Sequence, residues 1–144
     1  MNPFRFSSDI VESLGHYVYL YINPLDNKIF YVGKGSGNRV LQIDGRNEKC
    51  NRILGQIKDQ GKEPIIEILV HGLNEDIAAK KIEAAVIDLI GLENLCNGAR
   101  GWESVKFGRM ELNELISIYR RERVTIDDPV MLIRINKLYH YGMT

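Results

Sequence analysis

The sequence predicts an α+β domain in which helices flank a small three-stranded antiparallel sheet. Two patterns carry this prediction: alternating side chains on both sides of a turn-rich loop near the N-terminus, and helical periodicity bounded by caps and glycines farther along. At 144 residues the chain suits one compact domain with an appendage. We place the domain at 1–104, and a C-terminal extension of one helix and one strand, or the start of a further domain, at 105–144.

A β-hairpin is the first large element expected, after a single helical turn near Leu14. From Tyr17 to Ile22 tyrosines alternate with aliphatic residues, so the two kinds of side chain should lie on opposite faces of a strand. The turn formers at 23–27 favour a hairpin loop, and a second strand should follow at 28–34. The glycine-rich segment GKGSGN should end that second strand.

Three helices and a third strand should complete the domain. Polar residues before the helices and glycines after two of them supply the start and stop signals. The expected elements are a short helix at 39–44, a helix at 47–60 ending at Gly61, a strand at 65–70, and a helix at 74–90 capped by Asn74 and ended by Gly91. In the extension we expect a helix at 110–123 and a strand at 130–135.

The composition limits the classes of protein to which this chain can belong. Lys and Arg equal Asp and Glu at 19 each, which argues against a strong stand-alone nucleic-acid binder but leaves room for a local basic patch. There is no apolar run long enough to predict a membrane span, and no export signal at the N-terminus. Cys50 and Cys96 lack CxxC or Cys/His spacing, so we expect reduced, buried thiols rather than a disulfide or a zinc site. These observations favour a cytoplasmic protein.

Glu83 is the strongest single candidate for a functional residue. On the helix expected at 74–90, three of its four neighbours one turn away are apolar, and the fourth is Lys80, so its carboxylate should lie in or beside the buried stripe. A buried carboxylate is costly unless it is paired or binds a metal. Two alternatives stay open: a salt bridge to Lys80 or a nearby arginine, and a ligand for a hard divalent cation.

The other candidates have ordinary structural explanations when each is taken alone. Tyrosines that share a strand face commonly pack, and a tyrosine with a pKa of about 10 is a poor base unless cations stabilise its phenolate. Lys34 and Arg39 are surface charges by default, and Asn97, before a glycine, is a turn former. The glycine-rich loop lacks the spacing of a phosphate-binding P-loop. The order of these residues along the chain is more informative than any one of them.

That order resembles the GIY-YIG nuclease domain, in which two tripeptides on adjacent strands precede an arginine, a helical glutamate and an asparagine. The corresponding residues here are Tyr17-Val18-Tyr19, Tyr31-Val32-Gly33, Arg39, Glu83 and Asn97. Gly15-His16-Tyr17 is an alternative first tripeptide, but the separation of Tyr19 from Tyr31 is more like that of the family. The segments FYVGKGSGNRV and IEAAVIDLIGLENLCNGARG are especially similar to the LEM-3/Ankle1-like branch and its bacterial relatives.

The resemblance implies hydrolysis of phosphodiester bonds in DNA with one divalent metal ion, Mg²⁺ or Mn²⁺. It implies that Glu83 holds the metal, that Tyr19 activates the attacking water, and that Tyr31 is a positioning or alternative acid–base group. It further implies that Arg39 stabilises charge on the phosphate, that Lys34 supports the phosphate or the phenolate, and that Asn97 fixes the geometry by hydrogen bonding. The DNA could be branched or otherwise structured, and a double-strand break would need a homodimer or two binding events, since one active site cuts one strand.

Two positions depart from the family pattern. Ile43 stands where many members carry a histidine or a tyrosine four residues after the arginine, and Tyr17 stands where the first tripeptide usually begins with glycine. Ile43 leaves three alternatives: a weaker nuclease, a nuclease that uses another side chain such as Gln42, His16 or His71, or a domain that binds nucleic acid without cutting it. A structural adaptor with a salt-bridged Glu83 is the least specific alternative.

Overall fold

The structure, a computed structural model of the chain, describes residues 5–43 and 47–127. These residues belong to two compact units that separate between Arg109 and Met110. The first unit contains the sheet and four helices, and the second contains α5 (Leu112–Asp127), close to the helix expected at 110–123. The strand expected at 130–135 lies outside the described residues, and the division into 1–104 and 105–144 stays a prediction.

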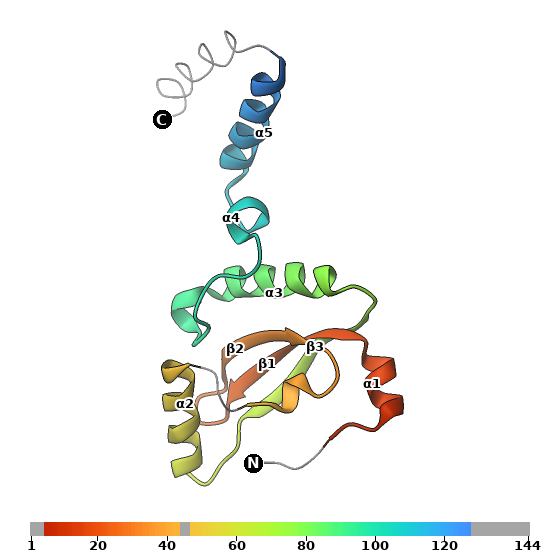
Figure 1. Cartoon of the computed structure of the whole chain (residues 1–144). Coiled ribbons are helices and arrows are strands. Elements are labelled where there is room, and N and C mark those ends of the chain that lie inside the picture. Colours follow the sequence, from red (N-terminus) through yellow and green to blue (C-terminus); the bar gives the residue numbers. More distant parts are fainter. Residues whose placement is uncertain (1–4, 44–46, 128–144) are drawn as a thin grey trace. The chain divides into compact units, whose positions relative to one another are not determined.

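A three-stranded antiparallel sheet is the centre of the first unit, which confirms the fold class that the sequence predicts (Figure 1). The strands are β1 (His16–Asn23), β2 (Lys28–Gly35) and β3 (Ile65–Leu73), in the spatial order β2-β1-β3. In the hairpin loop the side-chain oxygens of Asn23 and Asp26 accept hydrogen bonds from the backbone amides of Leu25 and Lys28, both at 2.9 Å. The turn formers thus close the hairpin as expected.

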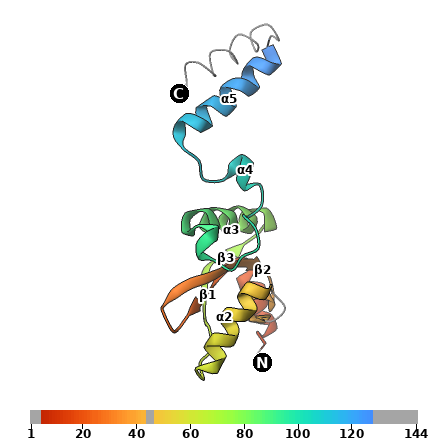
Figure 2. The same ribbon diagram turned by 90° about the vertical axis from the view of Figure 1, so that its left-hand side faces the viewer.

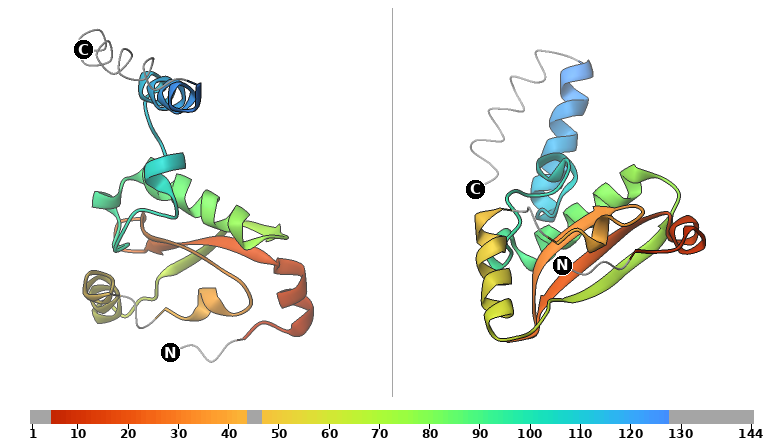
Figure 3. Two further views of the ribbon diagram at one scale, coloured as in Figure 1. Left: turned by 45° about the horizontal axis from the view of Figure 1, so that its top comes forward. Right: turned by 60° about the horizontal axis from the view of Figure 1, so that its bottom comes forward.

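The alternation along β1 divides the core of this unit into two clusters. On one face Tyr17, Tyr19 and Tyr21 are buried against α2 (Glu48–Asp59) and the 3₁₀ turn η1 (Arg39–Leu41). On the other face Val18 and Leu20 pack against α3 (Asp76–Ile90). Figures 1 and 2 show α3 on one side of the sheet and α2 on the other, and both views in Figure 3 agree. The tyrosines and the aliphatic residues of β1 therefore lie on opposite faces, as the alternation predicts, and both faces of β1 are buried, whereas Ile65, Glu67 and Leu69 of β3 stay exposed.

Several element boundaries differ from those expected. β2 continues to Gly35 because that residue pairs with Tyr17 of β1, and β3 continues to Leu73, opposite His16. The helix expected at 39–44 is only the single 3₁₀ turn η1. α3 begins at Asp76 after Glu75, so Asn74 is not the capping residue. In each case tertiary pairing or packing outweighs the local signal.

Three shorter elements complete the description of the first unit. α1 (Ser8–Leu14) is longer than the single turn expected, has Gly15 as its C-cap residue and leads directly into β1. The 3₁₀ turn η2 (Leu92–Asn94) follows α3, and α4 (Ser104–Phe107) comes near the end of the unit. None of the helices in the described part of the chain has the length and apolar character needed to span a lipid bilayer.

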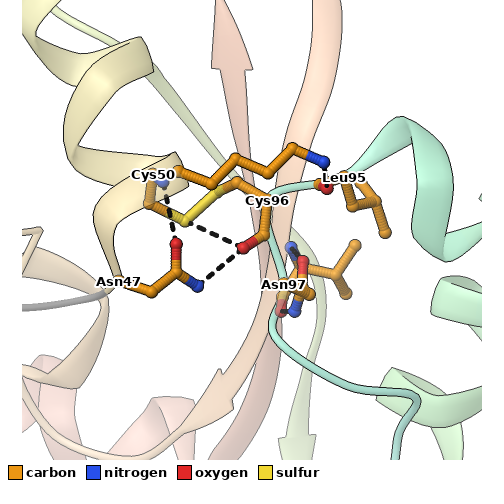
Figure 4. The surroundings of a disulfide bond; sticks show 7 residues. Asn47, Cys50, Leu95, Cys96 and Asn97 are labelled. Atoms are coloured by element: carbon orange, nitrogen blue, oxygen red, sulfur yellow. Dashed lines mark hydrogen bonds between the residues drawn. A yellow bond between two sulfur atoms is a disulfide. The ribbon is translucent and has the colours of Figure 1, made fainter.

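The two cysteines form a disulfide, so the expectation of reduced thiols is wrong, although their burial is as expected. Cys50 lies in the first turn of α2 and Cys96 in the loop after η2, 46 residues apart in sequence and 5.1 Å apart between Cα atoms (Figure 4). Sequence motifs such as CxxC identify only cysteines that are close together in the chain. Cys50 and Cys96 meet because α2 and the loop both pack against the cluster that contains Phe30 of β2 and the tyrosines of β1. The cytoplasmic location stays a prediction.

Side chains of α2 hold the same loop in parallel with the disulfide. Asn47 donates from Nδ2 to the Cys96 carbonyl, and Lys49 donates from Nζ to the Leu95 carbonyl, both at 2.7 Å. Figure 4 shows Asn47 and the disulfide meeting the loop beside Asn97. The N-terminal end of α2 therefore fixes the backbone of residues 95–96 by covalent and hydrogen bonds together.

Reduction of the disulfide should lower the free energy of unfolding by about 2–4 kcal/mol, because the bond restricts the unfolded chain. Urea unfolding of the oxidised and reduced protein, followed by circular dichroism, measures the difference. The double variant Cys50→Ala/Cys96→Ala is the control, and its stability should not respond to reductant. Two titratable thiols in the oxidised wild-type protein would show instead that the cysteines are unpaired.

Candidate active site

Tyr19 reaches across the neighbouring strand because the residue opposite it is glycine. The register of β1 and β2 pairs Tyr19 with Gly33. A Cβ atom at Gly33 would lie 2.5 Å from both the Cζ and the hydroxyl oxygen of Tyr19. The end of the phenol ring thus occupies the space that any side chain at position 33 would fill. Because β2 is an edge strand, this brings the Tyr19 hydroxyl toward the rim of the sheet.

Arg39 lies over the next glycine on the same face of β2. A Cβ atom at Gly35 would lie 2.6 Å from Cγ and 2.7 Å from Cβ of Arg39. The arginine opens η1, directly after the glycine-rich loop, and its Nη1 donates to Oε1 of Gln42 at 3.0 Å. Gly33 and Gly35 together therefore allow a tyrosine and an arginine to lie side by side across one strand.

Tyr17 and Tyr21 hold η1 in place under the site. The Tyr17 hydroxyl donates to the Gly37 carbonyl at 2.8 Å and accepts from the Val40 amide at 3.0 Å. The Tyr21 hydroxyl donates to the Val40 carbonyl at 2.8 Å. Burial raises the pKa of Tyr17 above its ordinary value. The Tyr17 hydroxyl, with two backbone partners, is therefore an anchor of η1.

Tyr31 completes the aromatic group on this face. Its ring centroid lies 6.2 Å from that of Tyr19 and 5.4 Å from that of Tyr21, and its side chain is half-buried. Tyr31 is thus more accessible than Tyr19, of which 1% is exposed. The structure brings Tyr19, Tyr31 and Arg39 together on one face of β2.

Lys34 extends to the opposite face, toward α3. Its Nζ donates to Oδ1 of Asp76 at 2.7 Å, and Lys80 lies 3.3 Å from the other oxygen of the same carboxylate. The hydrogen bond from Lys34, with further help from Lys80, holds the pKa of Asp76 below its ordinary value. His16 lies 3.9 Å from Asp76. Lys34 therefore lies on the same edge strand as Tyr31 but does not share a face with the tyrosines.

Glu83 approaches β2 from α3, on the side of Lys34. It shares a line along the helix with Asp76, which contacts Lys34, and with Ile87, which is buried in the cluster that contains Val32. The side chain is half-buried. Glu83 thus belongs to the face of α3 that packs on β2, whereas Tyr19 lies on the other side of the strand. The candidate residues lie on both sides of β2 rather than on one wall.

Asn97 lies at the outer edge of β2 between these two groups. Its Oδ1 accepts from the Val32 amide at 3.0 Å, and its Nδ2 donates to the Val32 carbonyl at 2.7 Å. The Cys96 amide donates to the Phe30 carbonyl at 2.7 Å. The side chain of Asn97 therefore continues the sheet ladder in place of a fourth strand and fixes the middle residue of the second tripeptide.

The described residues offer a metal ion few protein ligands. Among them, no group of three or more His, Cys, Asp or Glu side chains is arranged to hold a metal. A Mg²⁺ ion bound through one carboxylate keeps most of its water and also takes substrate phosphate oxygens. A hard cation held at the single carboxylate of Glu83 would therefore take its remaining ligands from water and from substrate phosphate.

Ile43 occupies a packing position. Its half-buried side chain lies against the cluster that contains Tyr17, Tyr19 and Tyr21. The position that departs from the family pattern thus adds to the core beneath the tyrosines. Its neighbour Gln42, by contrast, is exposed and accepts a hydrogen bond from Arg39.

Sequence reasoning missed three parts of this arrangement. It treated Gly33 and Gly35 as turn residues and not as the flat surface under Tyr19 and Arg39. It also missed the ion pair of Lys34 with Asp76 and the disulfide next to Asn97. The alternation of residues 31–35 was a usable signal, because it assigns the glycines to the tyrosine face and Lys34 to the other face.

Comparison with known proteins yields one match. A family model described as the LEM-3-like GIY-YIG domain matches residues 20–123, most of the chain. The match includes Tyr31, Arg39, Glu83 and Asn97, begins directly after Tyr19 and extends into α5. Searches of curated proteins and of solved structures found no match.

Substitution of Gly33 by alanine should displace Tyr19 and destabilise the fold by about 1–3 kcal/mol, because the new methyl group would overlap the phenol ring. Urea unfolding measures this change.

Gly55→Ala is the matched control, since a Cβ atom there meets nothing within 4 Å and the position is inside α2. This variant should be more stable than the wild type by about 0.5–1 kcal/mol. Equal stabilities of Gly33→Ala and the wild type would contradict the position assigned to Tyr19.

Proposed function

The chain belongs to the LEM-3-like GIY-YIG family, and from this premise we propose that it is a DNA endonuclease that depends on Mg²⁺ or Mn²⁺ and hydrolyses phosphodiester bonds. Membership confirms the resemblance inferred from the residue order and implies a nuclease-type activity on nucleic acid. GIY-YIG nucleases are generally dependent on a divalent metal. The proposal adds DNA as the substrate, the identity of the ions and the roles of individual residues.

One observation carries the proposal: Tyr19 and Arg39 lie across the two glycines of the edge strand. This supports a scissile phosphate bound at the rim of β2, within reach of side chains from both faces of the sheet. Arg39 would hold the non-bridging oxygens, where negative charge develops during hydrolysis. The hydrogen bond from its guanidinium to Gln42 would fix the orientation of the planar donor group.

Tyr19 would accept the proton of the attacking water. A tyrosine has an ordinary pKa of about 10, so this role requires positive charge close to the hydroxyl. Arg39 supplies one such charge on the same face of β2. Tyr31, which is more accessible and whose ring lies 6.2 Å away, would position the water or take the proton itself.

Glu83 would bind the metal on the leaving side of the phosphate, from the opposite face of the strand. The bound ion would supply Lewis-acid stabilisation of the charge on the leaving oxygen. Lys34 would support the phosphate from the same side, in exchange for part of its contact with Asp76. Asn97 would keep β2 in register between the two groups through its paired hydrogen bonds to Val32.

The site would cut one strand in each encounter, because it holds one tyrosine–arginine pair and one helical glutamate. Cleavage of both strands would then require a homodimer or two successive binding events. Branched or otherwise structured DNA is within the proposed range of substrates.

A second candidate function is that of a nucleic-acid-binding module with weak or no cleavage. The observation that favours it is Ile43, which packs into the core where many family members present a histidine or tyrosine to the substrate. In this case binding would depend on salt through Lys34, Arg39 and the other cations, and it would not require a divalent metal.

Substitution Glu83→Gln should lower the rate of metal-dependent DNA nicking by about 100-fold or more, because the metal contributes several kcal/mol to transition-state stabilisation. Conversion of supercoiled plasmid to the nicked form, with Mg²⁺ or Mn²⁺, measures the rate.

Glu67→Gln, at an exposed position on β3, is the control and should leave the rate unchanged. Circular dichroism should give the same spectrum for both variants. Metal-independent, salt-sensitive DNA binding by a wild-type protein that does not nick would support the binding module instead. Absence of both activities would leave a structural adaptor.

A further inference from the structure

A groove lies on the outer side of α3, away from the sheet, and has a volume of about 650 Å³. The lining residues that matter here are Lys81, Ala84, Leu89, Trp102, Phe107 and Arg109. Lys81, Ala85 and Leu89 follow one another at intervals of four residues along the exposed side of the helix. Glu83 belongs to the face that packs on β2, so the groove is distinct from the candidate active site.

The far wall of the groove is anchored firmly to α3. A Cβ atom at Gly101 would lie 2.4 Å from Cα of Ala84, so only glycine allows the loop to lie this close to the helix. Asp88 accepts two hydrogen bonds from Arg100, both at 2.9 Å, and one from the Arg109 amide at 2.9 Å. These contacts fix both ends of the segment that carries Trp102 and Phe107.

Two aromatic rings form this wall, of which Phe107 is exposed and Trp102 is half-buried. The ring centroids of Trp102 and Phe107 lie 6.5 Å apart, with an angle of 28° between their planes. Phe107 is 52% exposed and Leu89 is 72% exposed. Exposed apolar side chains that cluster in a groove often mark a binding site.

Positive charge lies close to the Phe107 ring. The ammonium groups of Lys81 and Lys106 lie 5.3 Å and 5.2 Å from the centroid of Phe107. Arg109 lines the groove, and its Nη1 donates to the backbone carbonyl of Asp88 at 3.5 Å. Among the described residues that line the groove, none carries a carboxylate.

We infer that this groove binds unpaired bases of single-stranded nucleic acid, in the strand that flanks the bond to be cut. Open aromatic rings with cations at their faces and edges are the combination on which successive bases stack while phosphates contact lysine and arginine. The volume lies within the range of small-ligand pockets, which suits one or two bases. The inference rests on the proposed function, because it adds a second contact for the same substrate.

The location on the far side of α3 indicates a single strand rather than a duplex. A strand bound at β2 must bend round a helix of about 10 Å in diameter to reach Trp102. Duplex DNA is stiff over about 150 base pairs, whereas a single strand turns within a few nucleotides. The protein would therefore favour DNA with an unpaired segment next to the cleavage position.

Trp102 reports on the groove directly, because it is the only tryptophan of the chain. The full chain, in buffer with a metal chelator, is titrated with a thymidine oligonucleotide of about ten nucleotides. Trp102 fluorescence should be quenched to saturation, and the affinity should fall as salt rises. A blunt duplex of the same length should quench more weakly, and equal quenching would overturn the preference for unpaired bases.

Phe107→Ala should weaken oligonucleotide binding by roughly 5- to 150-fold, the loss typical of one stacked base. Lys81→Gln leaves the aromatic wall intact. It should reduce the slope of the logarithm of affinity against the logarithm of salt concentration by about 0.7 in magnitude. The control is Tyr119→Ala, which removes an aromatic ring that is 55% exposed on α5 and should bind like the wild type.

Absence of quenching, or equal affinities for the wild type and both groove variants, would overturn the inference. A change of tryptophan emission with protein concentration alone would assign the groove to a second copy of the chain and would also overturn it. The plasmid assay separates this result from the proposed function. Nicking without quenching would refute only the groove, and quenching without nicking would refute only the nuclease.

Discussion

The candidate active site depends on the register in which β1 pairs with β2. Tyr19 lies opposite Gly33 and Tyr17 opposite Gly35, so each ring meets a residue without a side chain. If β1 shifted by one residue relative to β2, its tyrosines would point toward α3 and would lie next to Val32 or Lys34. The register is protected because both faces of β1 are buried in different clusters, one aromatic and one aliphatic. The interaction that builds the core therefore also positions the reactive groups.

The edge strand β2 is where the two halves of the site meet, and its outer edge is accordingly fixed. Asn97 satisfies the amide and the carbonyl of Val32, and Cys96 contributes a backbone hydrogen bond next to it. The disulfide and two side chains of α2 hold that loop in turn. An edge strand left open would invite pairing with another chain. Here the loop at residues 96–97 occupies that edge at Phe30 and Val32.

Two opposite faces of helix α3 would contribute to the proposed function. Its inner side carries Glu83 in line with Asp76 and Ile87, and its outer side forms the floor of the groove beneath Trp102 and Phe107. The loop that follows the helix connects these sides, since it holds Asn97 at β2 and Gly101, next to Trp102, against Ala84. A substrate strand could thus contact one rigid element at two points, which would position it with little loss of side-chain freedom on binding.

The sequence by itself determined the sheet, the two-sided core and the family. Alternation of tyrosine and aliphatic residues requires a strand covered on both faces, and the order of Tyr19, Tyr31, Arg39, Glu83 and Asn97 indicates the fold in which they occur. Only the tertiary structure decided that Asp76 engages Lys34 and that Cys50 bonds to Cys96. These contacts join residues 42 to 46 positions apart. Local periodicity carries no information about contacts between residues so far apart in the sequence, because these contacts depend on how the helices and loops pack on the sheet.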